Sequence, residues 1–212
     1  TKEDTEDALI ELNFLGIDNV LALRGDAIKS EPSFIPERDG HAHAKDLIHQ
    51  IAGLNKGKYL HDEELEAAPT DLCIGAACYP EKHAEALNLD TDIAYLKQKV
   101  DAGAEYLVTQ MFFDNARYFR FVELCRAAGI TVPIIPGLKP LTTLKHIAFI
   151  PKTFGIDLPQ PLASELVKCK TDSDVKRLGV EWSIAQTKDL MEKKAPCVHY
   201  YTMGKSEAVR AI

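Results

Sequence analysis

The sequence predicts an α/β fold built on a parallel β-sheet. Two observations carry this prediction: short apolar runs rich in Val, Ile and Leu are typical of buried strands, and amphipathic helical patterns separate them. The length of 212 residues fits one domain and part of a second. Two architectures share this pattern, an open doubly wound sheet and part of a (β/α)8 barrel, which in full needs about 250 residues.

The first half of the chain is expected to hold two helices and two strands. A helix over residues 6–15 precedes a short strand over residues 19–23, and an amphipathic helix follows over residues 42–54. The connection over residues 53–71 is long and is expected to contain a small insertion before a strand over residues 72–79. The apolar faces of the two helices are Leu9, Ile10, Leu12, Phe14 and Leu15, and Leu47, Ile48, Ile51 and Leu54.

The second half continues the alternation. Asp92 is expected to help begin the next helix, Gly129 ends the one after it, and Pro136 follows a short strand. The helices are expected over residues 92–102, 115–128 and 172–194, and the strands over residues 106–113, 132–135 and 198–202.

Composition excludes several classes of protein. Lys and Arg number 25 against 32 Asp and Glu, and the net charge of −7 argues against broad binding of nucleic acid or anionic membranes. No apolar run approaches the roughly 18 residues of a membrane span. Five cysteines without a CxxC pair are typical of reduced thiols in a cytoplasmic protein, and no signal peptide is visible. The chain begins at Thr1 rather than Met, so we expect residues upstream of it.

Polar residues follow several of the expected strands. Arg24-Gly25-Asp26 comes after the first strand, Tyr79 and His83 come at the end of the second, and Gln110 lies in the third. In parallel α/β folds, ligands bind at the carboxyl ends of the strands. Gly25 permits a positive φ and the close approach of a ligand to the backbone. These side chains are therefore expected to converge on one site.

The chemistry of these side chains suits an aromatic ring that carries phosphates. A buried Gln110 amide without partners costs about 1–3 kcal/mol, and its group both donates and accepts, as the amide edge of a heterocycle requires. Tyr79 offers a flat face, and Arg24, His83 and Lys99 are candidates to bind a diphosphate. The alternatives are structural: a surface turn with a salt bridge, and a histidine and an amide that hydrogen-bond within the fold.

Other motifs are weak or absent. His41-Ala-His43 has no third ligand at a useful spacing for a metal. The sequence contains no Walker A motif, no GxGxxG and no GxSxG, so neither a Rossmann nucleotide site nor serine hydrolysis is indicated.

Six motifs occur together and in order along the chain, and together they resemble the catalytic domain of the methylenetetrahydrofolate reductases, of the bacterial type. They are LALRGD over residues 21–26, ACYPEKH over 77–83, LKQKVDAGA over 96–104, TQMFFD over 109–114, IIPG over 134–137 and YYT over 200–202. The resemblance runs through essentially the whole chain. It implies one catalytic (β/α)8 TIM barrel domain over residues 1–212, of which this chain supplies about the last five βα units, with its N-terminal part missing.

The resemblance also implies an activity. Such enzymes bind FAD and reduce 5,10-methylenetetrahydrofolate to 5-methyltetrahydrofolate, with NADH or NADPH first reducing the flavin and the folate then taking the hydride from flavin N5. By this resemblance Asp26 and Gln110 are catalytic, and Asp26, Gln110 and Lys205 bind the folate. The positions that match flavin contacts are Arg24, Gly25, Asp26, Ala44, Tyr79, His83, Ala86, Asp92 and Lys99. A homo-oligomer is expected, with no metal and no nucleic-acid or membrane partner.

Several positions depart from the family pattern. Tyr95 and Gln98 replace Asn and Arg of bacterial relatives, His146 replaces a substrate-contacting Gln, and Lys205 replaces an Arg that could face the folate glutamate tail. The family's general acid, a Glu of the first βα unit, has no counterpart in this chain. Without the first units, the interior of the barrel would expose apolar side chains and two open edges.

Two other functions remain open from the sequence. The chain could be a truncated, non-catalytic remnant that binds flavin. It could also be a pterin-binding methyltransferase barrel, which shares the topology but lacks the pairing of Arg-Gly-Asp with Thr-Gln-x-Phe-Phe-Asp.

Overall fold

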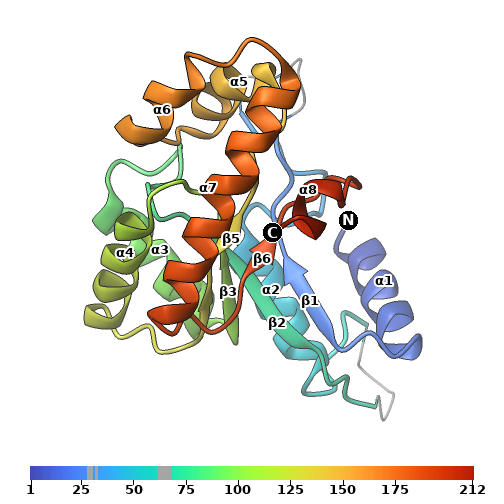
Figure 1. The fold of residues 1–212 in the computed structure, drawn as a ribbon. Coiled ribbons are helices and arrows are strands. Elements are labelled where there is room, and N and C mark those ends of the chain that lie inside the picture. Colours follow the sequence, from blue (N-terminus) through green and yellow to red (C-terminus); the bar gives the residue numbers. More distant parts are fainter. Residues whose placement is uncertain (28–30, 32, 62–67) are drawn as a thin grey trace. The chain divides into compact units, whose positions relative to one another are not determined.

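The computed structural model describes residues 1–27, 31, 33–61 and 68–212 (Figure 1). The chain divides into two compact units: the first unit is Thr1–Ala77 with Tyr95–Leu107, and the second unit is Cys78–Ala94 with Val108–Ile212. The helices are α1 (Lys2–Phe14), α2 (Ala44–Leu54), α3 (Leu89–Asp101), α4 (Asn115–Ala127), α5 (Leu144–Phe154), α6 (Gln160–Leu166), α7 (Asp172–Glu192) and α8 (Glu207–Arg210). The strands are β1 (Asn19–Ala22), β2 (Cys73–Cys78), β3 (Tyr106–Thr109), β4 (Ile134–Ile135), β5 (Gly137–Leu138) and β6 (His199–Tyr200).

The described strands form a four-stranded sheet in the order β1-β2-β3-β4 and a two-stranded sheet of β5 and β6. β1 pairs with β2 in parallel, with Asn19 opposite Cys73, and β5 pairs with β6 in parallel, with Gly137 opposite His199. The parallel α/β class predicted from the sequence is confirmed. The barrel stays a prediction.

The strand expected over residues 132–135 is present as β4, which ends directly before Pro136 as predicted. A second short strand, β5, follows Pro136 and was not expected from the sequence. Proline has no N–H to donate to a ladder, so the first ladder ends there. The Pro136 carbonyl accepts a hydrogen bond from the His199 amide at 2.9 Å, and the chain continues in the second sheet.

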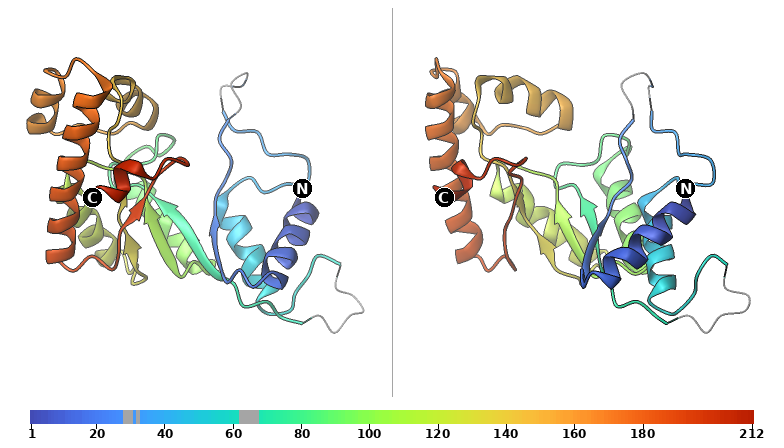
Figure 2. Two further views of the ribbon diagram at one scale, coloured as in Figure 1. Left: turned by 45° about the vertical axis from the view of Figure 1, so that its right-hand side comes forward. Right: turned by 90° about the vertical axis from the view of Figure 1, so that its right-hand side faces the viewer.

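In the first unit, α2 contacts both α1 and β1 (Figure 2). Ile48, Ile51 and Leu54 are fully buried on one face of α2, as the helical spacing predicted. On β2, a Cβ at Gly75 would lie only 2.3 Å from Tyr106 Cζ, so a glycine is required for the Tyr106 ring to cross the strand. β1 differs from its expectation as a buried strand, because it has a single neighbour in the sheet and leaves Leu21 exposed.

The apolar face predicted for the first helix is wrong. Only Leu9 of the five apolar residues is buried, and Phe14 is 88% exposed. In a helix of 3.6 residues per turn, side chains at positions 9, 10, 12, 14 and 15 point in all directions and do not form one apolar stripe. The helix also begins earlier than expected, at Lys2, because Thr1 and Asp4 form a capping box.

In the second unit, the long helix α7 packs against α4, α6 and α8. The core of this unit is a cluster of buried side chains from the segment after β3, from α5, α6 and α7, and from the segments that precede α5 and α6: Met111, Phe113, Leu141, Ile150, Ile156, Leu162, Leu166 and Val175. The helices α5, α6 and α8 were not expected from the sequence. Pro151 lies inside α5, where proline argues against a helix, whereas Pro161 lies in the first turn of α6, where proline is tolerated.

The remaining differences are at element ends. β3 ends at Thr109, four residues before its expected end, and α3 begins at Leu89, three residues before Asp92. The insertion expected over residues 53–71 includes residues 62–67, which lie outside the described residues. Among the described helices, none is both long and apolar enough to cross a membrane.

Candidate functional site

The turn after β2 gathers four of the positions predicted from the sequence. The Tyr79 and His83 rings meet edge to face, with their centroids 4.6 Å apart. The His83 amide donates to Asp92 Oδ2 at 2.7 Å, and the Ala86 amide donates to the His83 carbonyl at 3.1 Å. Asp92 lies in the first turn of α3, and its carboxylate also holds the turn after β2. All four residues belong to the second unit, and their contact with a flavin stays a prediction.

The backbone of this turn is strained at Lys82. The Lys82 amide donates to the Tyr79 carbonyl at 3.2 Å and closes the turn, and Lys82 has a φ of 94°. A residue with a Cβ rarely adopts this region. Lys82 Nζ donates to the Ala86 carbonyl at 2.6 Å, so the side chain ties the strained residue to the segment that follows.

Gln110 lies at the end of β3, directly after Thr109, and not inside the strand as expected. Its backbone amide donates to the Cys78 carbonyl at 2.8 Å, which places it beside the end of β2. Its side-chain Oε1 accepts from the Met111 amide at 3.0 Å. Gln110 Nε2 makes no hydrogen bond with any described residue, and the side chain is only half-buried. The nitrogen is therefore available to donate to a ligand.

The segment after β1 carries Arg24, Gly25 and Asp26 in the first unit. The Arg24 guanidinium lies over the Phe34 ring, 4.9 Å from its centroid, and Gly25 and Asp26 are exposed. Gly25 does not have a positive φ, so the backbone conformation that glycine permits is not used here. A Cβ built on Gly25 would meet Phe34 Cε2 at 3.4 Å, which is close to ordinary contact. The described protein atoms would therefore accept a small side chain at this position.

Two further predicted positions belong to the first unit. Lys99 Nζ donates to the Ala77 carbonyl at 3.0 Å, near the carboxyl end of β2. Ala44 is the first residue of α2, where His43 and Asp46 form a capping box. The predicted site residues are therefore divided: Arg24, Gly25, Asp26, Ala44 and Lys99 are in the first unit, and Tyr79, His83, Ala86, Asp92, Gln110 and Lys205 are in the second. Their convergence on a single ring stays a prediction.

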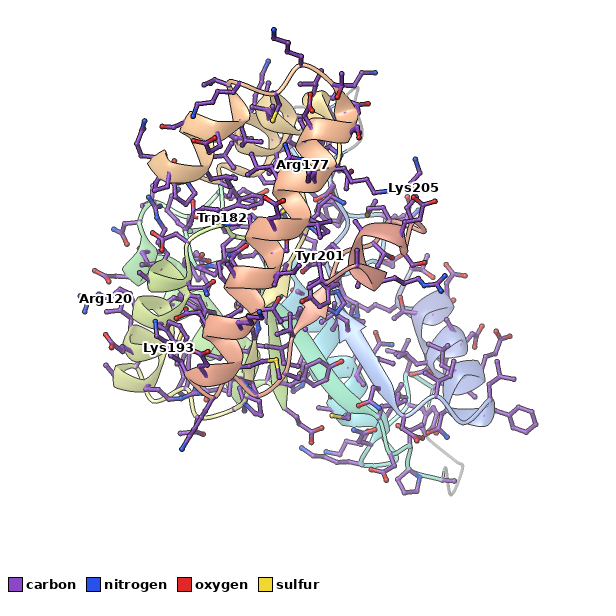
Figure 3. The ribbon with its side chains drawn as sticks, viewed as in Figure 1. Arg120, Arg177, Trp182, Lys193, Tyr201 and Lys205 are labelled. Carbon is purple, nitrogen blue, oxygen red and sulfur yellow. The ribbon has the colours of Figure 1, made fainter. Side chains whose placement is uncertain are left out.

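The end of the chain brings Tyr201 and Lys205 into the second unit (Figure 3). The Tyr201 hydroxyl donates to the Thr109 carbonyl at 2.8 Å, and burial raises the pKa of Tyr201 to about 12. Lys205 is exposed on a tight turn in which Met203 has a φ of 49°. The role of Lys205 in binding a ligand stays a prediction.

Sequence reasoning overlooked Lys139, which follows β5 directly, as Gln110 follows β3. Lys139 Nζ lies 3.5 Å from the Tyr201 carbonyl oxygen, and burial lowers the pKa of Lys139. His146 Nδ1 accepts from the Thr142 amide at 3.2 Å, and burial together with the Lys139 charge lowers the pKa of His146. A polar residue directly after a strand was the signal that could have found Lys139.

The histidines near α2 do not form a metal site with other described residues. His41 Nε2 lies 2.5 Å from Gln50 Oε1, so this ring is used in a hydrogen bond. Within the part of the chain that the structure describes, no group of three or more His, Cys, Asp or Glu side chains could hold a metal ion.

Comparison with known proteins identifies the family. "Methylenetetrahydrofolate reductase 2" of Saccharomyces cerevisiae is 37% identical over 209 residues, which are 96% of this chain and 32% of that protein. "Methylenetetrahydrofolate reductase 1" of Schizosaccharomyces pombe is 34% identical over 206 residues, 97% of this chain and 32% of that protein. The "5,10-methylenetetrahydrofolate reductase" of Escherichia coli is 31% identical over 200 residues, 93% of this chain and 60% of that protein.

The chain thus spans about a third of the length of its fungal relatives. A solved structure of an uncharacterized Clostridium thermocellum protein is described as binding two copies of 5-methyl-5,6,7,8-tetrahydrofolic acid. The match covers 99% of this chain and 85% of that chain, with 18% identity and a TM-score of 0.47. The methylenetetrahydrofolate reductase family profile matches residues 1–212, from the first residue to the last. The chain therefore belongs to the methylenetetrahydrofolate reductase family.

Proposed function

We propose that the protein is a flavin-dependent oxidoreductase that reduces 5,10-methylenetetrahydrofolate to 5-methyltetrahydrofolate with NADH or NADPH as electron donor. The match of the family profile over residues 1–212 is the observation that carries this proposal. Curated relatives named for NADPH and for NADH both align with nearly all of this chain, from Caenorhabditis elegans and from Oryza sativa, so the choice between the two donors is left to experiment.

The proposal includes FAD as the cofactor. The geometry of the second unit is compatible with such a group, because Tyr79 and His83 form one aromatic pair and the amide nitrogen of Gln110 is available beside the end of β2. Tyr79, His83, Ala86 and Asp92 would bind FAD from that unit, and Arg24, Gly25, Asp26, Ala44 and Lys99 are the matching positions of the first unit. When bound, FAD supplies a two-electron hydride carrier between the nicotinamide and the folate in a ping-pong sequence.

The roles of this chain's own residues follow from their chemistry. Gln110 Nε2 donates a hydrogen bond and orients the neutral pterin, since an amide forms it without adding a charge. Asp26 is exposed and places a carboxylate near the reacting rings. There its negative charge disfavours the reduced flavin when that form is anionic, and it favours a cationic form of the substrate. Lys205 attracts the carboxylates of the glutamate tail, as a point charge and without the two-pronged geometry of an arginine.

The remaining expectations belong to the same proposal. The chain supplies about the last five βα units of a (β/α)8 barrel, as a single catalytic domain over residues 1–212, and the enzyme works in the cytoplasm as a homo-oligomer. No residue of this chain is assigned as the general acid of the reaction.

Colour is the direct test of the proposed function. The purified protein should absorb in the flavin region, lose that absorption anaerobically with NADH or NADPH, and regain it when 5,10-methylenetetrahydrofolate is added. A yellow protein that neither nucleotide bleaches would be a non-catalytic flavin-binding remnant. A protein that binds no added FAD but binds a pterin would fit a methyltransferase barrel, and either result would overturn the proposal.

A further inference from the structure

Glu81 is a buried carboxylate in the middle of the turn that carries Tyr79 and His83. Its side chain is only 7% exposed. Glu81 Oε2 accepts a hydrogen bond from the Asp157 amide at 2.7 Å and lies 3.4 Å from Arg117 Nη1. Glu81 Oε1 is buried and has no hydrogen-bond partner among the described residues. The carboxylate is thus held firmly through one oxygen and left unsatisfied at the other.

The partners of Glu81 come from two other elements of the second unit. Arg117 lies in the first turn of α4, and Asp157 lies between α5 and α6. Arg117 Nη2 also contacts Asp157 Oδ2 at 2.5 Å, so the guanidinium joins the two acids. Through this arrangement the turn after β2 is attached to α4 and to the segment that precedes α6.

The buried Glu81 carboxylate is not expected to contribute much to the free energy of unfolding. Burial raises the pKa of Glu81, while the Asp157 amide and the Arg117 charge lower that pKa and the charges of Asp157 and Asp114 raise it again. Replacing a buried, partly paired ion by a neutral group of similar shape is often neutral or stabilising. A carboxylate with one unsatisfied oxygen is therefore poorly explained as a contribution to the free energy of unfolding, and well explained as a fixed point for the turn.

The strained backbone at Lys82 also indicates that the turn after β2 is held in place by its surroundings. A residue with a Cβ stays at a φ of 94° only where its surroundings hold it there. Glu81 anchors the turn on one side of Lys82, and the bond from the His83 amide to Asp92 anchors it on the other. The edge-to-face pair of Tyr79 and His83 spans this doubly anchored segment.

We propose that Glu81 is a positioning residue of the candidate site: held by Arg117 and the Asp157 amide, it fixes the turn on which the Tyr79 and His83 rings are presented to the ligand. That the ligand is FAD rests on the proposed function, whereas the anchoring of the turn does not.

The first experiment tests the anchoring without any ligand. Native-state hydrogen exchange is measured at the His83 and Ala86 amides, whose bonds depend on the turn. We expect Glu81→Ala to speed their exchange at least tenfold and Glu81→Gln, which keeps an acceptor for the Asp157 amide, to change it less than threefold. Unchanged exchange in Glu81→Ala would overturn the proposal, whether or not the protein binds flavin.

The second experiment tests the consequence for the ligand. FAD is titrated into the apoprotein and its Kd is measured by fluorescence. Glu81→Ala should raise the Kd at least tenfold, and Glu81→Gln should stay within threefold of the unsubstituted protein. The matched control is Arg120→Met. Arg120 lies on the exposed face of α4, the helix that carries Arg117, and its guanidinium is 3.7 Å from the Glu123 carboxylate (Figure 3). This substitution should change neither the exchange rates nor the FAD Kd.

The outcomes of the two experiments are separable. If Glu81→Ala lowers the melting temperature and speeds exchange but leaves the FAD Kd unchanged, Glu81 is only structural and the proposal is wrong. If the unsubstituted protein binds no FAD, the proposed function fails, and the exchange rates of the His83 and Ala86 amides alone then decide whether Glu81 anchors the turn.

Discussion

Replacing Lys82 by glycine should reveal how much strain the candidate site stores. Lys82 has a φ of 94°, and a residue held in a sparsely populated region costs about 1–3 kcal/mol. Glycine removes this strain, but it also adds unfolded-state entropy that costs about 0.4–1 kcal/mol. Either Lys82→Gly or Lys82→Ala loses the contact of Nζ with the Ala86 carbonyl. The comparison of these two variants therefore isolates the backbone contribution.

Subtracting the two costs, we expect Lys82→Gly to be more stable than Lys82→Ala by about 1 kcal/mol. A difference of this size shifts the melting temperature of a chain of this length by about 2–4 °C. The control is the same pair of substitutions at Lys97, inside α3. There the order should reverse, because glycine in a helix interior is about 1 kcal/mol less favourable than alanine.

Urea unfolding followed by circular dichroism measures all four variants under one condition. The informative quantity is the sign of the glycine-minus-alanine difference at each position, which does not depend on the fate of either ammonium group. If Lys82→Ala proves as stable as Lys82→Gly, or more stable, the backbone at this position is not strained, and the turn needs no anchors to hold it.

Four further predictions concern the site and its surroundings. Asp26→Asn should leave the melting temperature unchanged and slow folate reduction more than flavin reduction in stopped-flow half-reactions; equal slowing of both would remove Asp26 from its role. Gln110→Glu should weaken folate binding in a calorimetric titration, because it replaces the amide donor by a charge, and an unchanged affinity would make Gln110 structural. Tyr118→Phe should cost about 1–3 kcal/mol in urea unfolding, since the buried hydroxyl donates to the Ile134 carbonyl at 2.7 Å. The pKa of Glu81 is raised in the folded protein, so its contribution to the free energy of unfolding is present at low pH and is lost as pH rises through that pKa. The free energy of unfolding of the unsubstituted protein, relative to Glu81→Gln, should therefore fall with rising pH. A difference between the two that stays constant from pH 4 to pH 8 would contradict this.

The parts of the fold that the sequence predicted correctly are those governed by local periodicity. Ile48, Ile51 and Leu54 recur at helical spacing and are all buried on one face of α2. The same reasoning failed for residues 6–15, where apolar residues are dense but do not recur with the period of a helix, and Phe14 points into solvent. Periodicity, and not apolar content, carried the information.

Proline set a second limit on prediction. Pro136 ends β4, as the sequence predicted, but β5 directly after it was not expected and belongs to the other sheet. Pro151 occupies the interior of α5, and this helix was not expected from the sequence although Ile150 is buried in the core beside it. Proline removes a hydrogen-bond donor wherever it occurs. Whether the chain then turns, continues its helix or enters another sheet depends on packing against residues far away in the sequence.

In the candidate site, too, the sequence predicted what depends on neighbouring residues and missed what depends on distant ones. Tyr79, His83 and Ala86 lie within eight residues, so a single turn after a strand was enough to bring them together, and their grouping followed from the sequence. Glu81 lies in the same segment but was not singled out, because its environment is made by Arg117, 36 residues later, and by the Asp157 amide, 76 residues later.

The contrast between Glu81 and Gln110 shows why burial has to be known before a polar residue can be interpreted. Both follow a strand and both carry a group that hydrogen-bonds, and the sequence predicted a buried amide at Gln110. In the structure, Gln110 is half-exposed with a nitrogen available to a ligand, whereas Glu81 is almost completely buried and satisfied at one oxygen only. A residue of the first kind suits contact with a substrate, and one of the second kind suits holding other residues in place. The two are told apart by partners from distant elements, and a chain read residue by residue does not contain that information.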